Sequence, residues 1–110
     1  MSWSVAILRR ITPMTPNDAI EKLRSHETEL KRAGVRHLYL FGSTMRGDAR
    51  PDSDVDMFFD YDKGSFGLFA LMDVKEMAAA ILGHRADIMT RDSLHPVLRA
   101  RIEADAIEIF

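Results

Sequence analysis

A glycine–serine turn that precedes two alternating aspartates is the feature of this sequence with the clearest chemistry. The turn holds Gly42 and Ser43, and the run Ser53-Asp54-Val55-Asp56 follows shortly after it. Backbone N–H groups exposed by such a turn can bind phosphate oxygens. Alternate residues of an extended strand point to the same face, so Asp54 and Asp56 can share a metal ion. The spacing therefore predicts a site for a nucleotide phosphate held together with a divalent cation.

The two aspartates would be a poor structural choice without a ligand, because like charges on one strand face repel. A divalent cation removes that repulsion, and Mg²⁺ is commonly bound by one or two carboxylates together with substrate phosphates. Asp87 lies on a later predicted strand and is the candidate third carboxylate, which would complete a two-metal site and orient the attacking hydroxyl. The competing interpretation of Asp54 and Asp56 is a solvated strand edge, which the combination of turn, spacing and third acid disfavours.

Two better-known phosphate and metal motifs begin here but are not completed. The stretch 42–47 opens like a P-loop, but Asp48-Ala49 stand where that loop needs lysine and a hydroxyl residue. The stretch 52–56 opens like a calcium-binding EF-hand loop, but Met57 replaces the required glycine and Lys63 the bidentate glutamate. A Walker-type nucleotide site and a calcium sensor are therefore both excluded.

Length, charge and cysteine content exclude several classes of protein. The chain has 110 residues, of which 46% are apolar and 29% charged, and this balance predicts one folded domain with a single core. The formal net charge of −2 argues against binding nucleic acid over the whole surface. The absence of cysteine excludes disulfides and thiolate zinc sites and is typical of a reducing cytoplasm.

The N-terminus is expected to be an arm or strand over residues 1–14, followed by a single domain over residues 15–110. Its short apolar run is followed, not preceded, by Arg9 and Arg10, which is the reverse of a secretory signal. No apolar stretch in the sequence is long enough to span a bilayer. We therefore expect a cytoplasmic protein without membrane contact.

The hydrophobic pattern predicts helices that alternate with short strands. Helices are expected from a cap at Thr15 to a stop at Gly34, from a cap at Ser43 through Arg46, over 68–82 and over 94–104. Strands are expected over 35–41, 54–60, 85–90 and 106–110, the last at a sheet edge. This order predicts an α+β fold of the mixed α/β type, a short mixed β-sheet with helices packed on it.

Apolar residues at helical spacing mark the expected inner faces of two helices. In the helix over 68–82 they are Leu68, Met72, Met77, Ala78 and Ile81. In the last helix they are Leu98 and Ile102. Trp3, Phe66 and Phe69 are expected to be exposed, which favours burial of one face against another protein. Asp60 and Asp62 are expected on a solvated turn.

The combined pattern resembles the signature of a known family. Gly-Ser-x-x-Arg-Gly over 42–47, followed by Ser-Asp-x-Asp over 53–56, is similar to the motif of minimal nucleotidyltransferases in the DNA polymerase β-like superfamily. That superfamily also includes aminoglycoside nucleotidyltransferases. Residues 83–90 look like the strand that carries the family's third acid, and residues 94–103 look like its closing helix. The resemblance runs from about residue 15 to the end.

The resemblance implies the small nucleotidyltransferase fold. It also implies that the protein transfers a nucleotide from ATP with the help of two Mg²⁺ ions. Gly42 and Ser43 would contact the triphosphate, and the motif also assigns Arg46 and Ser53 to nucleotide binding. Asp54, Asp56 and Asp87 would be the metal ligands and catalytic acids, with Asp87 helping to activate the acceptor hydroxyl. Arg46 has an equally weighted alternative, an ion pair with Asp48 or Asp52.

Stand-alone members of this size resemble antitoxins that accompany a HEPN-domain ribonuclease toxin and adenylylate it on tyrosine. The expected partners are therefore a HEPN toxin and a nucleoside triphosphate, in a homo- or hetero-oligomer, without direct contact to nucleic acid. Two alternatives stay open. The chain could neutralise its toxin by binding alone, or it could transfer a nucleotide to a small molecule such as an aminoglycoside, which its length disfavours.

Overall fold

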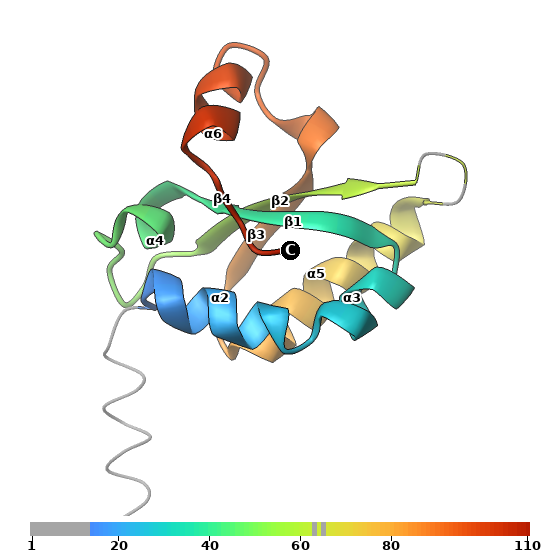
Figure 1. The fold of residues 1–110 in the computed structure, drawn as a ribbon, viewed down its shortest axis with the longest axis horizontal. Coiled ribbons are helices and arrows are strands. Elements are labelled where there is room, and N and C mark those ends of the chain that lie inside the picture. Colours follow the sequence, from blue (N-terminus) through green and yellow to red (C-terminus); the bar gives the residue numbers. More distant parts are fainter. Residues whose placement is uncertain (1–13, 63, 65) are drawn as a thin grey trace, which may run out of the picture.

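The computed structural model describes residues 14–62, 64 and 66–110. They form a four-stranded mixed sheet in the order β3-β2-β1-β4 (Figure 1). The strands are β1 (Val35–Phe41), β2 (Val55–Tyr61), β3 (Ala86–Thr90) and β4 (Ile107–Glu108). Strand β1 is antiparallel to both β2 and β4, whereas β2 and β3 are parallel. The α+β class and the mixed sheet are confirmed. The division into an arm and a domain stays a prediction, because residues 1–13 lie outside the described part.

The helices lie on both sides of this sheet. They are α2 (Pro16–Arg24), α3 (Glu27–Arg32), α4 (Gly42–Arg46), α5 (Leu68–Leu82) and α6 (Arg99–Asp105), with a short 3₁₀ turn η1 (Arg91–Ser93). Helices α2, α3 and α5 cover one face, and α6 stands over the other (Figure 1). Within the described ranges, none of the helices has the length and apolar character needed to cross a membrane.

Side-chain alternation along the strands gives the sheet two different faces. The face toward α2, α3 and α5 carries the core, to which the strands contribute Val35, Leu38, Leu40, Val55, Met57, Phe59 and Ile88. On the opposite face, Tyr39 pairs with Phe58 and Phe41 with Asp56 across β1 and β2. Asp56 is in turn opposite Asp87 on β3. The predicted acids therefore lie on the face away from the three-helix layer.

The first predicted helix is divided in two. Thr15 caps α2 as expected, because its Oγ1 accepts a hydrogen bond of 3.1 Å from the Asp18 N–H. The helix ends at Arg24, where the Ser25 hydroxyl and the His26 Nδ1 both lie 2.8 Å from the carbonyl of Lys22. Side chains thus occupy the carbonyl that a continuing helix would use. The expectation of one uninterrupted helix was wrong for this reason.

The cap predicted at Ser43 was also wrong. Helix α4 begins at Gly42, with extended Phe41 as its N-cap and no side-chain cap, so Ser43 lies inside the first turn. The bounds of α5 are confirmed: it ends at Leu82 and is capped by Gly83, whose φ of 62° is in the left-handed region.

The inner face predicted for α5 was only partly right. Its buried residues are Val74, Ala78 and Leu82, and Met77 and Ile81 are partly buried beside them. Met72 lies on the side of the helix away from these residues and is 49% exposed, and Leu68, its first residue, is 70% exposed.

The C-terminal segment departs most from expectation. Helix α6 begins at Arg99 rather than at 94. His95 precedes Pro96, and a residue before proline avoids the helical region. Residues 96–98 then form a turn, in which the Leu98 N–H donates to the carbonyl of His95 at 2.9 Å. Leu98 is consequently 48% exposed, whereas Ile102 is partly buried. The predicted edge strand is confirmed but shorter, with β4 paired to β1.

The three aromatic residues predicted to be exposed behave differently. Phe69 is 82% exposed, as expected. Phe66 is partly buried against the core, with its ring centroid 5.5 Å from that of Phe59 and 4.9 Å from that of Tyr61. Trp3 lies outside the described residues.

Candidate active site

The glycine–serine turn lies directly against an aspartate of the neighbouring strand. Strand β1 ends at Phe41, which pairs with Asp56 on β2, so the next residue, Gly42, comes beside the Asp56 carboxylate. Gly42 has a φ of +77°, and a Cβ at this position would lie 2.3 Å from Asp56 Oδ2. Only glycine fits here, for both conformation and space. The predicted phosphate turn and a predicted metal ligand are therefore in contact.

The parallel pairing of β2 and β3 adds the third predicted acid. Asp56 and Asp87 are register partners and point to the same face of the sheet. The pKa of Asp56 is raised above its ordinary value, first by partial burial and then by the negative charges of Asp87 and Asp54; Arg46 opposes the shift. Carboxylates that repel one another in this way suit a cation, and hard oxygen donors suit Mg²⁺. The donor set thus fits the predicted metal.

Asp54 is turned toward a different partner. Its Oδ1 lies 3.1 Å from Nε of Arg85, whose guanidinium also donates to the carbonyl of Asp52. Across the described ranges, no three His, Asp or Glu side chains are gathered closely enough to ligate one metal ion. A cation bound by all three predicted acids would therefore have to draw Asp54 away from Arg85. The exposed pair is weak, so this movement costs little.

The two remaining predicted residues, Ser53 and Arg46, have their own partners. Ser53 Oγ accepts a 3.0 Å hydrogen bond from the Arg50 N–H and closes the loop that leads into β2. Arg46 is exposed, with Nε 3.4 Å from Asp48 Oδ2, which is one of the two interactions expected for it. A long ion pair at the surface is readily exchanged for a phosphate.

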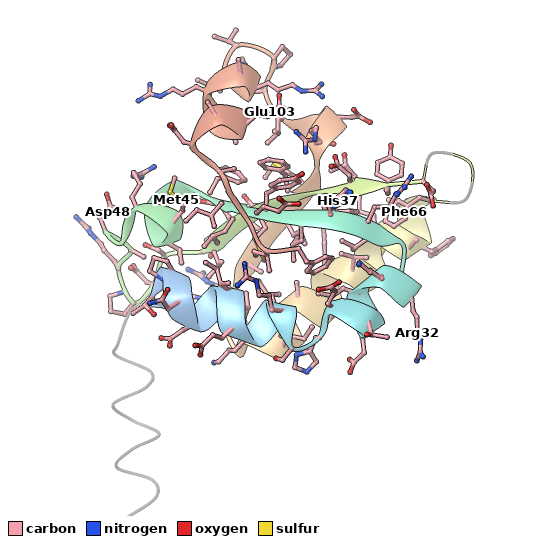
Figure 2. The ribbon with its side chains drawn as sticks, in the orientation of Figure 1. Arg32, His37, Met45, Asp48, Phe66 and Glu103 are labelled. Atoms are coloured by element: carbon pink, nitrogen blue, oxygen red, sulfur yellow. The ribbon has the colours of Figure 1, made fainter. Side chains whose placement is uncertain are left out.

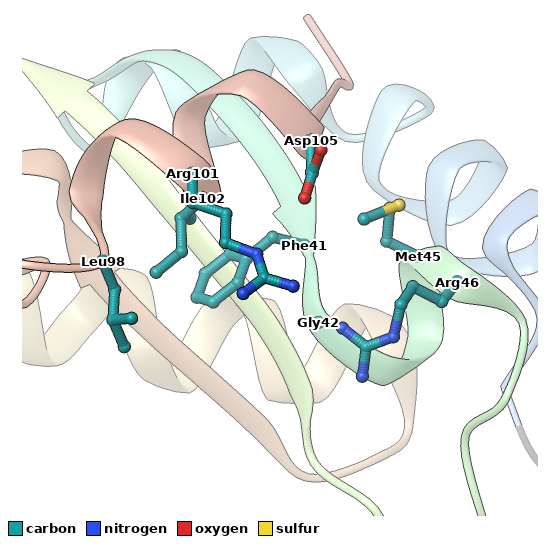
Figure 3. A pocket seen from close by; sticks show the side chains of 8 residues that line it. All are labelled: Phe41, Gly42, Met45, Arg46, Leu98, Arg101, Ile102 and Asp105. Carbon is teal, nitrogen blue, oxygen red and sulfur yellow. The ribbon is translucent and has the colours of Figure 1, made fainter.

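A cavity of about 400 Å³ opens beside Gly42, between α4 and α6 (Figure 3). Its walls come from two distant parts of the chain and comprise Phe41, Gly42, Met45, Arg46, Leu98, Arg101, Ile102 and Asp105. Sequence reasoning missed the residues of α6, because no motif links them to the turn. Gly42 nevertheless lines the cavity on one side and lies against Asp56 on the other, so the cavity extends the same site.

Arg91 holds α6 over this face of the sheet. Its Nε and Nη2 donate to both carboxylate oxygens of Asp60, at 2.7 and 2.9 Å, and its Nη1 donates to Glu103 of α6. The guanidinium carbon also lies 4.8 Å from the ring centroid of Tyr39 and 5.0 Å from that of Phe58. We call these five residues the α6 clamp; Figure 2 shows Glu103 on α6 above the sheet.

The clamp corrects one prediction and explains one pKa. Asp60 was expected on a solvated turn. It lies instead on β2, and its carboxylate accepts two hydrogen bonds from Arg91. The hydrogen bond from Arg91 holds the pKa of Glu103 below its ordinary value, with help from Arg99. Glu103 thus stays ionised beside Arg91, and the clamp positions the α6 wall of the cavity.

The nucleotidyltransferase domain family matches residues 23–109 of this chain. The chain belongs to this family. The match covers all four strands and the helices α3 to α6, and therefore includes the turn, the three acids and the cavity. The chain is thus an enzyme of the nucleotidyltransferase class.

Two relatives carry more specific names. The chain is 40% identical to the protein adenylyltransferase MntA of Thermococcus cleftensis over 66% of this chain and 73% of the relative. It is 33% identical to a candidate protein adenylyltransferase of Methanocaldococcus jannaschii, over 86% of this chain and 98% of the relative. The similarity therefore spans nearly the whole length of the second relative.

Solved structures show the same fold. A candidate minimal nucleotidyltransferase is 32% identical, with a TM-score of 0.67 over 80% of this chain and 93% of the other. An MNT antitoxin solved with a tri-AMPylated HEPN toxin from Shewanella oneidensis is 17% identical, with a TM-score of 0.56 over 79% of this chain and 68% of the other. The second likeness shows the fold alone.

Proposed function

We propose that this nucleotidyltransferase is a Mg²⁺-dependent protein adenylyltransferase. It would move AMP from ATP onto a hydroxyl, most simply a tyrosine hydroxyl, of a HEPN-type toxin and so act as its antitoxin. The names of the two relatives support protein as the acceptor, and the complex of an MNT antitoxin with a tri-AMPylated HEPN toxin supports the partner. The observation that carries the proposal is the contact between the Gly42 turn and Asp56, with Asp87 opposite Asp56.

In this proposal the turn and the acids have separate tasks. The backbone N–H groups that follow Gly42, the Ser43 hydroxyl and the Arg46 guanidinium bind the triphosphate. Asp56 and Asp87 are the metal ligands, and Asp54 joins them when it leaves Arg85. Two bound Mg²⁺ ions would supply charge neutralisation at the attacking and leaving oxygens. Ser53 keeps the loop before Asp54 in place.

In the proposed transfer step, Asp87, opposite Asp56 on β3, meets the acceptor hydroxyl. The acceptor hydroxyl oxygen bonds to the α-phosphorus of ATP, the bond to the bridging oxygen breaks, and pyrophosphate leaves. Asp87 orients the hydroxyl and takes up its proton. The acceptor must approach on the face of the sheet that α6 covers only in part, since the opposite face is filled by α2, α3 and α5.

One observation favours a second candidate, neutralisation of the toxin by binding alone. Asp54 is paired with Arg85, and the described residues hold no ready cluster of three metal ligands. A protein that only occludes its toxin would not need that cluster. The names of the relatives and the close fit of Gly42 to Asp56 argue for catalysis instead.

A labelling experiment separates the two candidates. The purified chain is incubated with Mg²⁺, host lysate and ATP radiolabelled at the α-phosphate, and proteins are separated by denaturing electrophoresis. The catalytic proposal predicts a labelled protein band that is absent with Asp87→Asn. Toxin neutralisation in cells without any labelled band would support occlusion and overturn the catalytic proposal.

A further inference from the structure

An arginine of α6 faces the phosphate turn from the far side of the cavity. Arg101 and Arg46 both line the cavity beside Gly42, and their guanidinium groups point toward one another across it (Figure 3). Arg46 comes from the helix that follows the turn, whereas Arg101 comes from the C-terminal helix. Two cations on opposite walls of one cavity, next to a glycine turn, form a setting for a multiply charged anion.

Arg101 has no other evident task in the structure. Within residues 14–62, 64 and 66–110, its guanidinium makes no ion pair or side-chain hydrogen bond, although Asp105 lies one helical turn away on α6. By contrast, Arg99 and Arg91, its neighbours around α6, are both engaged with Glu103. The α6 clamp therefore fixes the helix while leaving Arg101 available to a ligand.

We propose that Arg101 is a further substrate-binding residue, which with Arg46 holds the β- and γ-phosphates of the nucleoside triphosphate. This inference rests on the proposed function and adds to it a reason for preferring a triphosphate. In this arrangement the Gly42 turn and the acids lie around the α-phosphate. The two arginines then bind the β- and γ-phosphates, which carry the rest of the negative charge. A monophosphate would reach the turn but not the pair of arginines.

A substitution of Asp105 tests the proposal independently of Arg101. Its carboxylate lines the same cavity, from the end of α6 nearer Met45 (Figure 3). A negative charge there repels a triphosphate, so its removal should strengthen binding, opposite in sign to the removal of Arg101. Effects of opposite sign from two residues on one helix cannot come from a general loosening of α6.

The test is calorimetric titration of the full chain with ATP and with AMP in the presence of Mg²⁺. A lost charge-assisted contact lowers affinity roughly 10- to 100-fold, and we expect this loss for ATP with Arg101→Met, which keeps the aliphatic stem. AMP affinity should not change. Arg101→Lys should be intermediate, since lysine keeps the charge but not the planar fork. Asp105→Asn should bind ATP more tightly.

The matched control is Arg32→Met on α3, which removes the same charge on the other side of the sheet and should leave both affinities unchanged (Figure 2). Thermal unfolding checks that each variant is folded. If wild type binds ATP and Arg101→Met binds it equally well, or loses AMP and ATP alike, this inference alone is overturned. If wild type binds no ATP with Mg²⁺, the proposed function falls as well.

Discussion

Gly42, the first residue of α4, lies directly against the carboxylate of Asp56 near the start of β2. The backbone at Gly42 has a φ of +77°, and a Cβ there would lie 2.3 Å from Asp56 Oδ2 and 3.1 Å from Asp56 Cβ. The backbone of the phosphate turn therefore comes closer to the Asp56 carboxylate than any residue with a Cβ would permit. A metal ion at Asp56 and a phosphate at the turn would then be neighbours, as nucleotidyl transfer requires.

Replacing this glycine should damage the site more than the fold. We expect Gly42→Ala to lose ATP binding and to destabilise the protein by roughly 1–3 kcal/mol, through left-handed strain and the collision with Asp56. Calorimetry with ATP and thermal unfolding measure the two effects. Gly47→Ala is the matched control: its φ is +78°, but a Cβ there meets nothing within 4 Å. Equal losses in the two variants would contradict the close-contact account.

Neutralising Asp56 should stabilise the protein when no divalent cation is present. Its pKa is raised in the folded state, mainly by burial and by Asp87, so its ionisation costs stability. That cost is absent below the unfolded value of 3.8, grows as the pH rises through the raised pKa, and is constant above it. In EDTA at neutral pH, Asp56→Asn should unfold at a higher temperature than wild type. The gain should disappear toward acid pH.

With Mg²⁺, wild type should become more stable than Asp56→Asn. The cation binds the folded wild type and relieves a repulsion between carboxylates that the variant does not have. Saturating Mg²⁺ should raise the unfolding temperature of wild type but not of Asp56→Asn, and the variant should transfer no nucleotide. Asp54→Asn serves as the comparison, since it also breaks the pair with Arg85 and should gain less in EDTA. A wild type that is indifferent to Mg²⁺ would remove the metal assignment.

Asp87 should matter for transfer rather than for nucleotide binding. Asp87→Asn keeps the shape of the side chain but cannot accept the proton of the acceptor hydroxyl. We expect nucleotidyl transfer to be abolished while ATP affinity stays within about threefold of wild type, measured by labelling and by calorimetry. Full transfer by this variant toward a co-expressed toxin would show that the third-acid role is wrong.

The α6 clamp should contribute to stability and to the shape of the cavity. Arg91→Met leaves the partly buried carboxylate of Asp60 without its bidentate partner and Glu103 with Arg99 alone, so we expect a loss of roughly 1–3 kcal/mol in urea unfolding. Amide hydrogen exchange in α6 should accelerate more than in α5. Equal exchange of α6 in both proteins would show that other contacts hold this helix.

The clamp also predicts a pH dependence opposite in sign to that of Asp56. The pKa of Glu103 is lowered by Arg91, so its contribution is full above the unfolded value of 4.5 and is lost as the pH falls through the folded value. Glu103→Gln should therefore lose the part of the acid sensitivity that lies below pH 4.5. Identical acid profiles for wild type and variant would contradict this role of Glu103.

Much of the site's framework could be predicted because it depends on local sequence. Periodicity and glycines give the bounds of β1 and α5, and the residue type gives the cap at Thr15. Strand alternation places Asp56 on the face opposite to Val55 and Met57. The pairing of Asp56 with Asp87 could be proposed because both acids lie on strands. The contact of Gly42 with Asp56 could not, since it depends on the register between β1 and β2.

The features that were missed depend on tertiary contacts or on competing side chains. The interruption at Ser25 arises from hydroxyl and imidazole groups that take the Lys22 carbonyl. Arg91 reaches from η1 to Asp60 and Glu103, and this clamp decides where α6 lies. Arg101 therefore enters the site through packing, without any motif that could have identified it.

The central claim, that this chain transfers AMP to a protein, is tested most directly with two differently labelled samples of ATP. The chain is incubated with a co-purified HEPN toxin, Mg²⁺ and ATP labelled at either the α- or the γ-phosphate. Nucleotidyl transfer predicts that the toxin gains label from α-labelled ATP only, and that Asp56→Asn gives none. Label from γ-labelled ATP, or an unlabelled toxin that is nonetheless neutralised, would contradict the account.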